Sequence, residues 1–205
     1  MRIYLVAAAV MALACKRAEP VVIPPDSANA AATAHATSGM PSTSVASNCG
    51  ISGQPVLTDQ GIGELRIGKS VTGTKQVCDV VSDANQQGSE GSMERVLAIR
   101  IAGEIVPATI VNDNVWRVAI TTPRIRTPDS LGVDSPLRRI ASMRGAQFFP
   151  GEDGVYAFVA DHCALSFRFS LPLRPPKGGQ WTAAAIATEH ADAVVDRVLL
   201  SECRK

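Results

Sequence analysis

One histidine and two serines of this chain have positions that could support hydrolysis. Ser166 lies shortly after Asp161-His162, so His162 could act as a general base toward a serine nucleophile. Ser70 is the second candidate nucleophile, but residues 68–73 have the spacing G-x-S-x-x-G and not the G-x-S-x-G of a nucleophile elbow. A hydrolase that uses Ser70 or Ser166 with His162 is therefore the alternative hypothesis. We expect instead that Ser70 caps a helix and that His162 is solvated, and we predict no catalytic residue.

Metal and cofactor sites need residue spacings that the sequence lacks. Glu189-His190 has no second histidine at the spacing of H-E-x-x-H, and the cysteines form no C-x-x-C pair. Gly178-Gly179 follows two prolines and is typical of a loop, so it does not form a glycine-rich phosphate site. We predict no metal site and no cofactor.

Four of the cysteines lie between residues 49 and 203, an even number that is typical of disulfides in an oxidising compartment. The sequence alone leaves three pairings open. We favour Cys49–Cys78 and Cys163–Cys203, because each pair joins cysteines that are neighbours in the sequence. Loops of this length contribute about 3–4 kcal/mol each to the free energy of unfolding.

The N-terminal residues have the layout of an export signal. Arg2 precedes an apolar run from Ile3 to Ala14, which ends on small residues directly before Cys15. This run is too short to cross about 30 Å of hydrocarbon as a helix. We therefore predict a signal peptide at residues 1–14 and a destination outside the cytoplasm.

The segment Ala12-Leu13-Ala14-Cys15 resembles the lipobox of bacterial lipoproteins. The resemblance implies that Cys15 is lipidated and that its acyl chains anchor the protein in a membrane. In the resembled lipoproteins an aspartate after the cysteine favours the inner membrane. Lys16 stands there instead, so we expect the outer membrane, with the body facing the periplasm or the cell surface. Ala12 and Ala14 also suit a general signal peptidase, which leaves a secreted or periplasmic protein as the alternative.

A tether and a folded body follow the predicted signal. Residues 15–48 are rich in Ala, Ser, Thr and Pro and contain too few large apolar side chains to offset the entropy of ordering the backbone. Residues 49–205 are enough for one domain with a sizeable core, or for two small units that share one core. Lys and Arg number 20 against 19 for Asp and Glu, without a basic block, so nucleic-acid binding is not predicted.

The body contains two similar segments, which are related by a constant offset of 66 residues. In each segment a short extended stretch leads into apolar residues at helical spacing, the pattern of a strand or loop followed by a short amphipathic helix. Ser70 would be the helix N-cap in the first segment, and Pro136 fits the first helical turn in the second. We therefore predict pseudo-repeats at residues 55–122 and 123–205. Their apolar residues coincide at Leu65/Leu131, Ile67/Val133, Val71/Leu137 and Val77/Met143.

After each predicted helix, apolar and polar residues alternate with the period of a strand. The turn at residues 112–114 predicts a hairpin. In the clearest strand, Cys163, Leu165, Phe167 and Phe169 are expected to face the core. The fold class is therefore α+β, an antiparallel sheet with short helices in two tandem helix-plus-sheet repeats. The strand-like runs are 96–102, 105–111, 116–120, 155–160, 163–169 and 194–203.

The pattern L-x-I-G-x-S-V at residues 65–71, followed by Val77-Cys78 and repeated more loosely at residues 131–143, resembles the helix start of small envelope modules. Those modules are the SmpA/BamE-like lipoproteins and the β-lactamase-inhibitor-like proteins, in which a short helical segment packs on an antiparallel sheet. The resemblance implies protein binding without catalysis and transfers no functional residue. Our hypothesis is a non-catalytic, membrane-anchored lipoprotein whose sheet face binds another envelope protein or contributes to envelope assembly. An exported hydrolase is the alternative.

Overall fold

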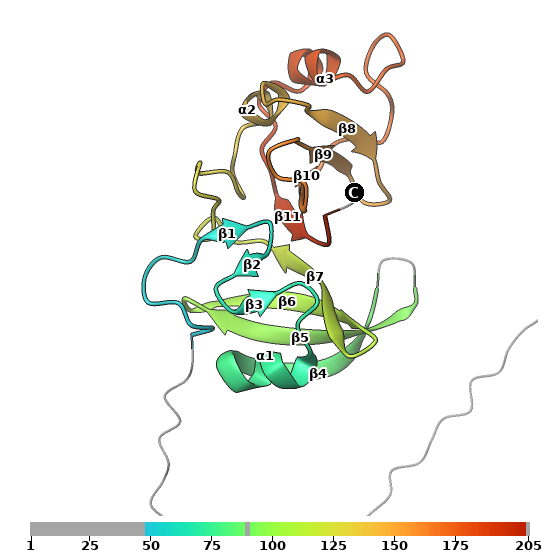
Figure 1. The fold of residues 1–205 in the computed structure, drawn as a ribbon. Helices are drawn as coiled ribbons and strands as arrows, with labels where there is room; N and C mark the ends of the chain where they lie inside the picture. Colours follow the sequence, from blue (N-terminus) through green and yellow to red (C-terminus); the bar gives the residue numbers. More distant parts are fainter. Residues whose placement is uncertain (1–47, 89–90, 204–205) are drawn as a thin grey trace, which may run out of the picture. The chain divides into compact units, whose positions relative to one another are not determined.

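An eight-stranded antiparallel sheet dominates the computed structural model, in which residues 48–88 and 91–203 are described (Figure 1). The strands of this sheet are β4 (Asp79–Gln87), β5 (Met93–Ile101), β6 (Glu104–Val111), β7 (Asn114–Ile120), β8 (Gln147–Pro150), β9 (Val155–Phe158), β10 (Leu165–Phe169) and β11 (Arg197–Leu200). A small meander contains β1 (Leu57–Thr58), β2 (Gly61–Ile62) and β3 (Leu65–Arg66), and the helices are α1 (Val71–Val77), α2 (Leu137–Ala141) and α3 (Ala183–Glu189). The strand order of the large sheet is β4-β5-β6-β7-β11-β10-β9-β8. The α+β class and the antiparallel sheet are thus confirmed.

The predicted signal peptide at residues 1–14 and the predicted lipidation site Cys15 lie outside the described residues, as does the predicted tether up to residue 47. Among the described residues, no helix has the length and the apolar character needed to cross a membrane. The described residues fall within one compact unit, Thr43–Lys205.

One face of the sheet forms the core. On β5, Leu97, Ile99 and Ile101 are fully buried, whereas Ala98 and Arg100 between them are not, as the two-residue period of a strand requires. The helices and the meander join the same hydrophobic cluster. Removal of these side chains from water is the main contribution to stability. The fully buried residues that the helices and the meander add are Leu57, Ile62, Leu65, Leu137, Ile140 and Ile186.

We call the opposite side of the sheet the open face. Its residues alternate with the core residues along each strand, and the register of the sheet places them next to one another. Many of them are small or polar, and those at the centre are partly exposed. The open-face residues are Val96, Ala98, Pro107, Thr109, Arg117, Ala119, Leu199, Arg197, Ser166, Arg168, Tyr156 and Phe149.

The two halves of the large sheet meet where β7 pairs with β11. The register is Ala119 with Leu199, Val118 with Leu200 and Ile120 with Val198. A rotation of 180° about the Ala119–Leu199 pair exchanges the two strands and places the Val118–Leu200 pair on the Ile120–Val198 pair. An approximate two-fold axis therefore passes through the Ala119–Leu199 pair. The strand order agrees, because β4-β5-β6-β7 on one side of the axis corresponds to β8-β9-β10-β11 on the other.

The segment before α1 and the segment before α2 have the same local structure. Gly68 and Asp134, which the offset of 66 aligns, both have a left-handed backbone, with φ of 80° and 66°. Helices α1 and α2 begin at Val71 and Leu137, which are also aligned. Pro136 is the N-cap of α2 and not part of its first turn, because its ψ of 138° is extended. Three backbone hydrogen bonds of the first half have counterparts in the second half. In the first half they are Gly68 N to Val115 O, Val71 N to Asp113 O and Val115 N to Lys69 O. In the second half the counterparts, in the same order, are Asp134 N to Val195 O, Leu137 N to Ala193 O and Val195 N to Ser135 O.

The disulfides join Cys49 to Cys78 and Cys163 to Cys203, the pairing that the sequence analysis favours. Cys49 and Cys78 are buried, and Cys78 is the C-cap of α1. The prediction that Cys163 faces the core from a strand is wrong. Cys163 is exposed, because β10 begins only at Leu165.

Candidate binding site on the sheet

The structure does not bring the candidate hydrolase residues together. Ser70 is the N-cap of α1, as predicted, and its Oγ accepts a hydrogen bond from the Gly73 amide at 3.1 Å. His162 precedes β10, and its Nε2 lies 3.2 Å and 3.3 Å from the two carboxylate oxygens of Asp129. Only 15% of the His162 side chain is exposed, so the prediction that it is solvated is wrong. Ser166 is buried on the open face, and within residues 48–88 and 91–203 no hydrogen bond joins His162 to either serine.

Metal-ligating side chains are also dispersed. In the described part of the chain, no group of three His, Cys, Asp or Glu side chains is placed to hold a metal ion. The Glu189 carboxylate accepts a hydrogen bond from the Lys177 amide at 2.9 Å, and His190 is the C-cap of α3. These two residues therefore have local structural contacts.

The open face contains a cavity of about 370 Å³, which we call the central cleft. Its lining residues are Gln86, Val96, Pro107, Thr109, Arg117, Ala119, Glu152, Asp153, Tyr156, Arg197 and Leu199. Ala119 and Leu199 lie on the approximate two-fold axis. Gln86 of β4 and Tyr156 of β9 line the same cavity, although these strands lie near opposite ends of the sheet. The sheet is therefore strongly curved, with the open face on its concave side, and both halves contribute to the cleft.

Two arginines occupy equivalent positions in the central cleft, one on each side of the axis. Arg117 Nη2 lies 3.3 Å from Glu94 Oε2, and Arg197 Nη1 lies 3.2 Å from Asp153 Oδ2. The Arg117 guanidinium also lies over the ring of Trp116, 4.9 Å from its centroid. A guanidinium has five N–H donors. Each arginine thus has N–H donors beyond the one in its ion pair, and both side chains line the cleft.

Asp153 connects three neighbours at the edge of the cleft. The Tyr156 hydroxyl donates to Asp153 Oδ1 at 2.6 Å, and Arg168 and Arg197 each lie 3.2 Å from Oδ2. Burial of the phenol and its hydrogen bond to the carboxylate raise the pKa of Tyr156 to about 12. Burial alone would raise the pKa of Asp153, but the Tyr156 hydrogen bond and the two arginine charges outweigh it and lower this pKa. At neutral pH the cluster therefore consists of a neutral phenol donor, a carboxylate and two guanidinium groups.

Exposed aromatic rings extend the open face toward β8. Phe149 and Phe158 are 48% and 42% exposed, and their rings meet edge to face with centroids 5.8 Å apart. The register places Phe149 opposite Tyr156. Aromatic and arginine side chains are enriched in protein–protein interfaces. The composition of the concave face thus suits contact with another protein.

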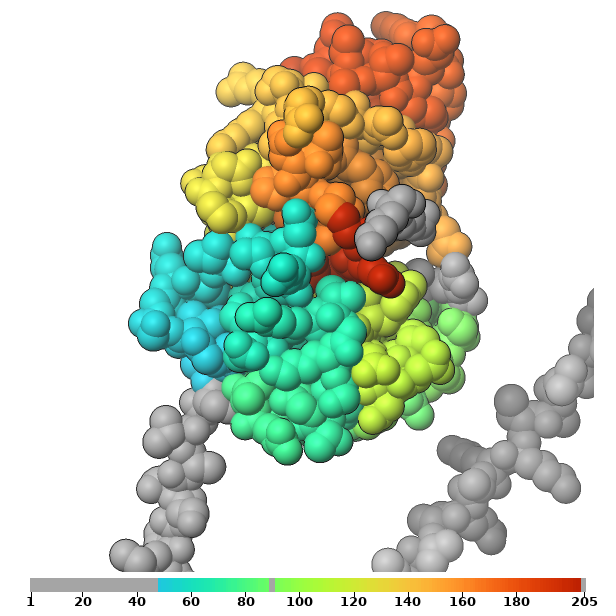
Figure 2. Space-filling view, viewed as in Figure 1, coloured from blue at the N-terminus to red at the C-terminus, as the bar shows by residue number. Residues whose placement is uncertain are grey.

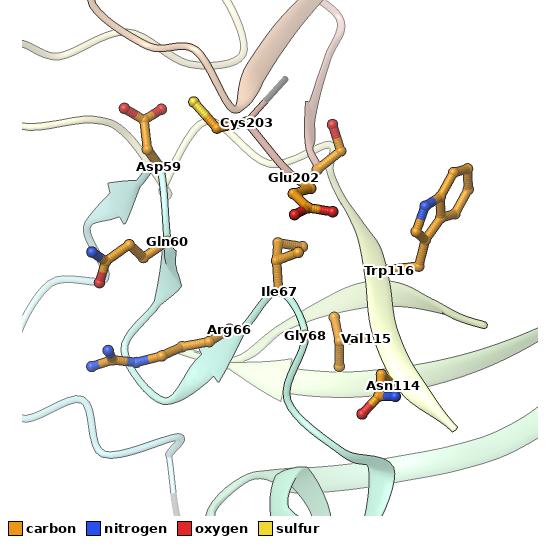
Figure 3. Close-up of a pocket in the computed structure, with 11 residues that line it drawn as sticks. Asp59, Gln60, Arg66, Ile67, Gly68, Asn114, Val115, Trp116, Glu202 and Cys203 are labelled. Atoms are coloured by element: carbon orange, nitrogen blue, oxygen red, sulfur yellow. The ribbon is translucent and has the colours of Figure 1, made fainter. Parts of the chain in front are cut away.

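A second cavity, of about 470 Å³, shares no lining residue with the central cleft, and we call it the side cavity (Figure 3). Ile67 and Val115 give it an apolar part, and Trp116 is 46% exposed beside them. Residues 201–203, which follow β11, form another part of the lining. In the space-filling view this segment (red) lies beside β1–β3 (cyan to teal) and the start of β7 (yellow-green) (Figure 2).

Comparison with known proteins identifies a shared fold. No protein-family model matches the chain, and no curated protein sequence matches it. A solved structure with a similar fold is that of the uncharacterized protein yfeY from Escherichia coli, with a TM-score of 0.53 and 12% sequence identity over 71% of this chain and 99% of that chain. At this identity the likeness concerns the fold alone.

The sequence analysis does not single out the charged residues of the central cleft. One sequence pattern does indicate Arg117 and Arg197 as equivalent residues, because V-x-R-V occurs at residues 115–118 and again at residues 195–198. No comparable pattern marks Asp153. It reaches the cleft through a turn between β8 and β9, and its role depends on contacts with strands that follow later in the chain.

Proposed function

We propose that this protein is a non-catalytic binding module of the bacterial cell envelope, and that it holds another envelope protein on the open face of its sheet. The observation that supports this best is the central cleft, a concave site on the approximate two-fold axis to which both halves contribute. Binding energy in protein interfaces is concentrated in a few Arg, Tyr and Trp anchors that small or neutral residues surround. Arg117, Arg197 and Tyr156 are such anchors here, and Ala119 and Thr109 leave room between them.

The charges of the cleft indicate what kind of partner fits. Arg117 and Arg197 are balanced by Glu152 and Asp153 among the lining residues. Such a balance gives no net attraction for a polyanion, so it favours a convex protein surface with mixed polar groups over nucleic acid. Phe149 and its neighbour Phe158 would add apolar contact beside the polar cleft.

Membrane anchoring is the second part of the proposal. The export signal at residues 1–14 and the lipobox-like residues before Cys15 support a lipid anchor in the outer membrane, with secretion or a periplasmic location as the alternative. The two disulfides are typical of exported proteins. Labelling of cells with radioactive palmitate tests the anchor: we expect label on the wild-type protein and none on Cys15→Ser. Absence of label from both proteins would exclude the anchor.

Photo-cross-linking in intact cells tests the binding function. A photoreactive amino acid replaces Thr109 or Leu199 in the central cleft, and replaces Thr72 on the exposed side of α1 in the matched control. We expect the same discrete protein adduct from Thr109 and Leu199 and none from Thr72. Equal adducts from all three positions, or none from the two cleft positions, would contradict binding at the open face.

One contact favours the hydrolase alternative. The Asp129 carboxylate lies 3.2 Å from His162 Nε2, and a carboxylate in this position orients a histidine base in many hydrolases. The nucleophile would have to be Ser70, which is the N-cap of α1, or Ser166, which is buried on the open face. A hydrolytic activity of the purified protein that His162→Ala abolishes would establish this alternative in place of the binding function.

A further inference from the structure

The two disulfides differ in how far a thiol can approach them. Cys49 and Cys78 are 0% and 4% exposed, whereas Cys163 is exposed and Cys203 is partly exposed. Thiol–disulfide exchange begins with the attack of a thiolate on one sulfur, so its rate depends on access to that sulfur. The Cys49–Cys78 bond is therefore protected as long as the protein is folded, and the Cys163–Cys203 bond is accessible in the native state.

The Cys163–Cys203 bond also lies at the end of a ladder of backbone hydrogen bonds. Strands β10 and β11 pair as far as Leu165 and Leu200, and the Ser201 amide then donates to the Ala164 carbonyl at 2.9 Å. Beyond Ser201, no hydrogen bond or ion pair to another described residue holds Glu202 or Cys203. Among the described residues, the disulfide is thus the one covalent or hydrogen-bonded link that holds residues 202–203, and Cys203 adds partial packing against the hydrophobic core.

Residues 201–203 form one side of the side cavity. Cys203 and Glu202 line it together with Ile67, Val115 and Trp116 (Figure 3). A cavity of this size is in the range that holds a small molecule or a protein side chain. A change that releases Glu202 and Cys203 would therefore open the cavity and expose more of the Trp116 ring.

We propose that Cys163–Cys203 is a native-state thiol–disulfide exchange site, and that its reduction opens the side cavity while the sheet stays folded. The reductant is a protein or small molecule with two thiols. Its first thiolate attacks one sulfur of the pair, which forms a mixed disulfide and releases the other cysteine as a thiolate. Its second thiolate then attacks the mixed disulfide and releases the remaining cysteine. The dithiol loses two electrons and two protons and becomes a disulfide, and Cys163 and Cys203 gain both as thiols.

Differential alkylation of the full-length protein tests the exchange. Native protein is incubated with increasing dithiothreitol and alkylated; it is then denatured, fully reduced and alkylated with a second, heavier reagent before peptide mass spectrometry. We expect the first label on Cys163 and Cys203 to appear at least about tenfold faster than on Cys49 and Cys78, because access limits the attack. Equal rates for the two pairs, or faster labelling of the buried pair, would overturn the proposal.

Fluorescence of Trp116 tests the opening of the cavity. In a Trp181→Phe background Trp116 is the remaining tryptophan, because the chain has two. We expect reduction to increase the quenching of Trp116 fluorescence by acrylamide, while the circular dichroism of the sheet is unchanged. The double variant Cys163→Ser/Cys203→Ser in the same background should show this higher quenching without reductant. Unchanged quenching after complete reduction of Cys163 and Cys203 would show that residues 202–203 stay in place. Loss of the circular dichroism signal of the sheet on reduction would show that the bond is needed for folding, and it would overturn the proposal.

Discussion

Arg117 and Arg197 are related by the approximate two-fold axis of the sheet, and each forms an ion pair with a carboxylate of its own half. Their side chains are 31% and 36% exposed, and the closest nitrogen–oxygen distances are 3.3 Å to Glu94 and 3.2 Å to Asp153. Ion pairs with this exposure contribute only about 0–1 kcal/mol to the free energy of unfolding. We therefore expect these arginines to matter for binding and much less for folding.

The first prediction concerns this separation of roles. Arg117→Ala or Arg197→Ala is expected to reduce the adduct formed from the Leu199 position about tenfold, as truncation of an interface anchor does. Thermal unfolding should change little. Arg124→Ala is the matched control, because Arg124 forms a similar 3.3 Å ion pair with Glu104 outside the central cleft. Full cross-linking in both cleft variants would contradict the role of the arginines.

The second prediction concerns the left-handed backbone before α1. A Cβ added at Gly68 or at Gly53 meets no heavy atom within 4 Å, but only Gly68 of this pair is left-handed, with φ of 80°. Gly68→Ala is expected to lower the free energy of unfolding by about 1 kcal/mol, because an L-residue pays a steric cost in this conformation. Gly53→Ala should be neutral or slightly stabilising. Urea denaturation measures both values, and equal effects would argue against the conformational reason.

The third prediction concerns the cap of α1. Ser70→Ala removes the hydrogen bond from the Gly73 amide to the serine hydroxyl and is expected to lower the free energy of unfolding by about 1 kcal/mol. Thr72→Ala is the control, since Thr72 is exposed inside the same helix and alanine has the higher helix propensity. Thr72→Ala should therefore leave stability unchanged or raise it. A loss of the same size in both variants would show that the cap is not the cause.

Features with a local signal are predictable from this sequence. The cap at Ser70 and the alternation of Leu165, Phe167 and Phe169 each depend on residues a few positions apart, and the structure has the helix and the strand that they predict. Features without such a signal escape prediction. Strand β4 is an edge strand that is exposed along most of its length, so its apolar and polar residues do not alternate. Helix α3 fully buries only Ile186, and its core-facing neighbours Ala183 and Ala187 are not distinguished in the sequence from the exposed Ala184.

The central cleft escapes prediction for a different reason. Its arginines recur at an offset of 80 residues, whereas the helix starts recur at an offset of 66. The second half has a longer connection, which contains α3, between β10 and β11. A constant offset therefore aligns the helices and misaligns the last strands. The pairing of β7 with β11, which places Arg117 and Arg197 in one cavity, is a long-range contact that the pattern of either strand does not specify.

The fourth prediction concerns the protonation of Tyr156. Burial and the hydrogen bond to Asp153 raise its pKa from the ordinary 10.0 to about 12 in the folded protein. The folded state thus binds the phenol proton more tightly than the unfolded chain does. The resulting contribution to stability is fully present below pH 10, and it is lost as the pH rises through about 12. The ultraviolet absorbance of phenolate measures this titration, and the difference between wild type and Tyr156→Phe isolates it from Tyr4.

Asp153→Asn provides the matched test of the cause. The variant keeps a hydrogen-bond acceptor of the same size beside Tyr156 but removes the negative charge that opposes formation of a phenolate. Asp153 both accepts the Tyr156 hydrogen bond and acts through its charge, so we expect the Tyr156 midpoint of the variant to fall from about 12 toward 10. Circular dichroism at each pH ensures that the folded protein is titrated. A wild-type midpoint near 10 in folded protein would contradict the contact between Tyr156 and Asp153 at the edge of the central cleft.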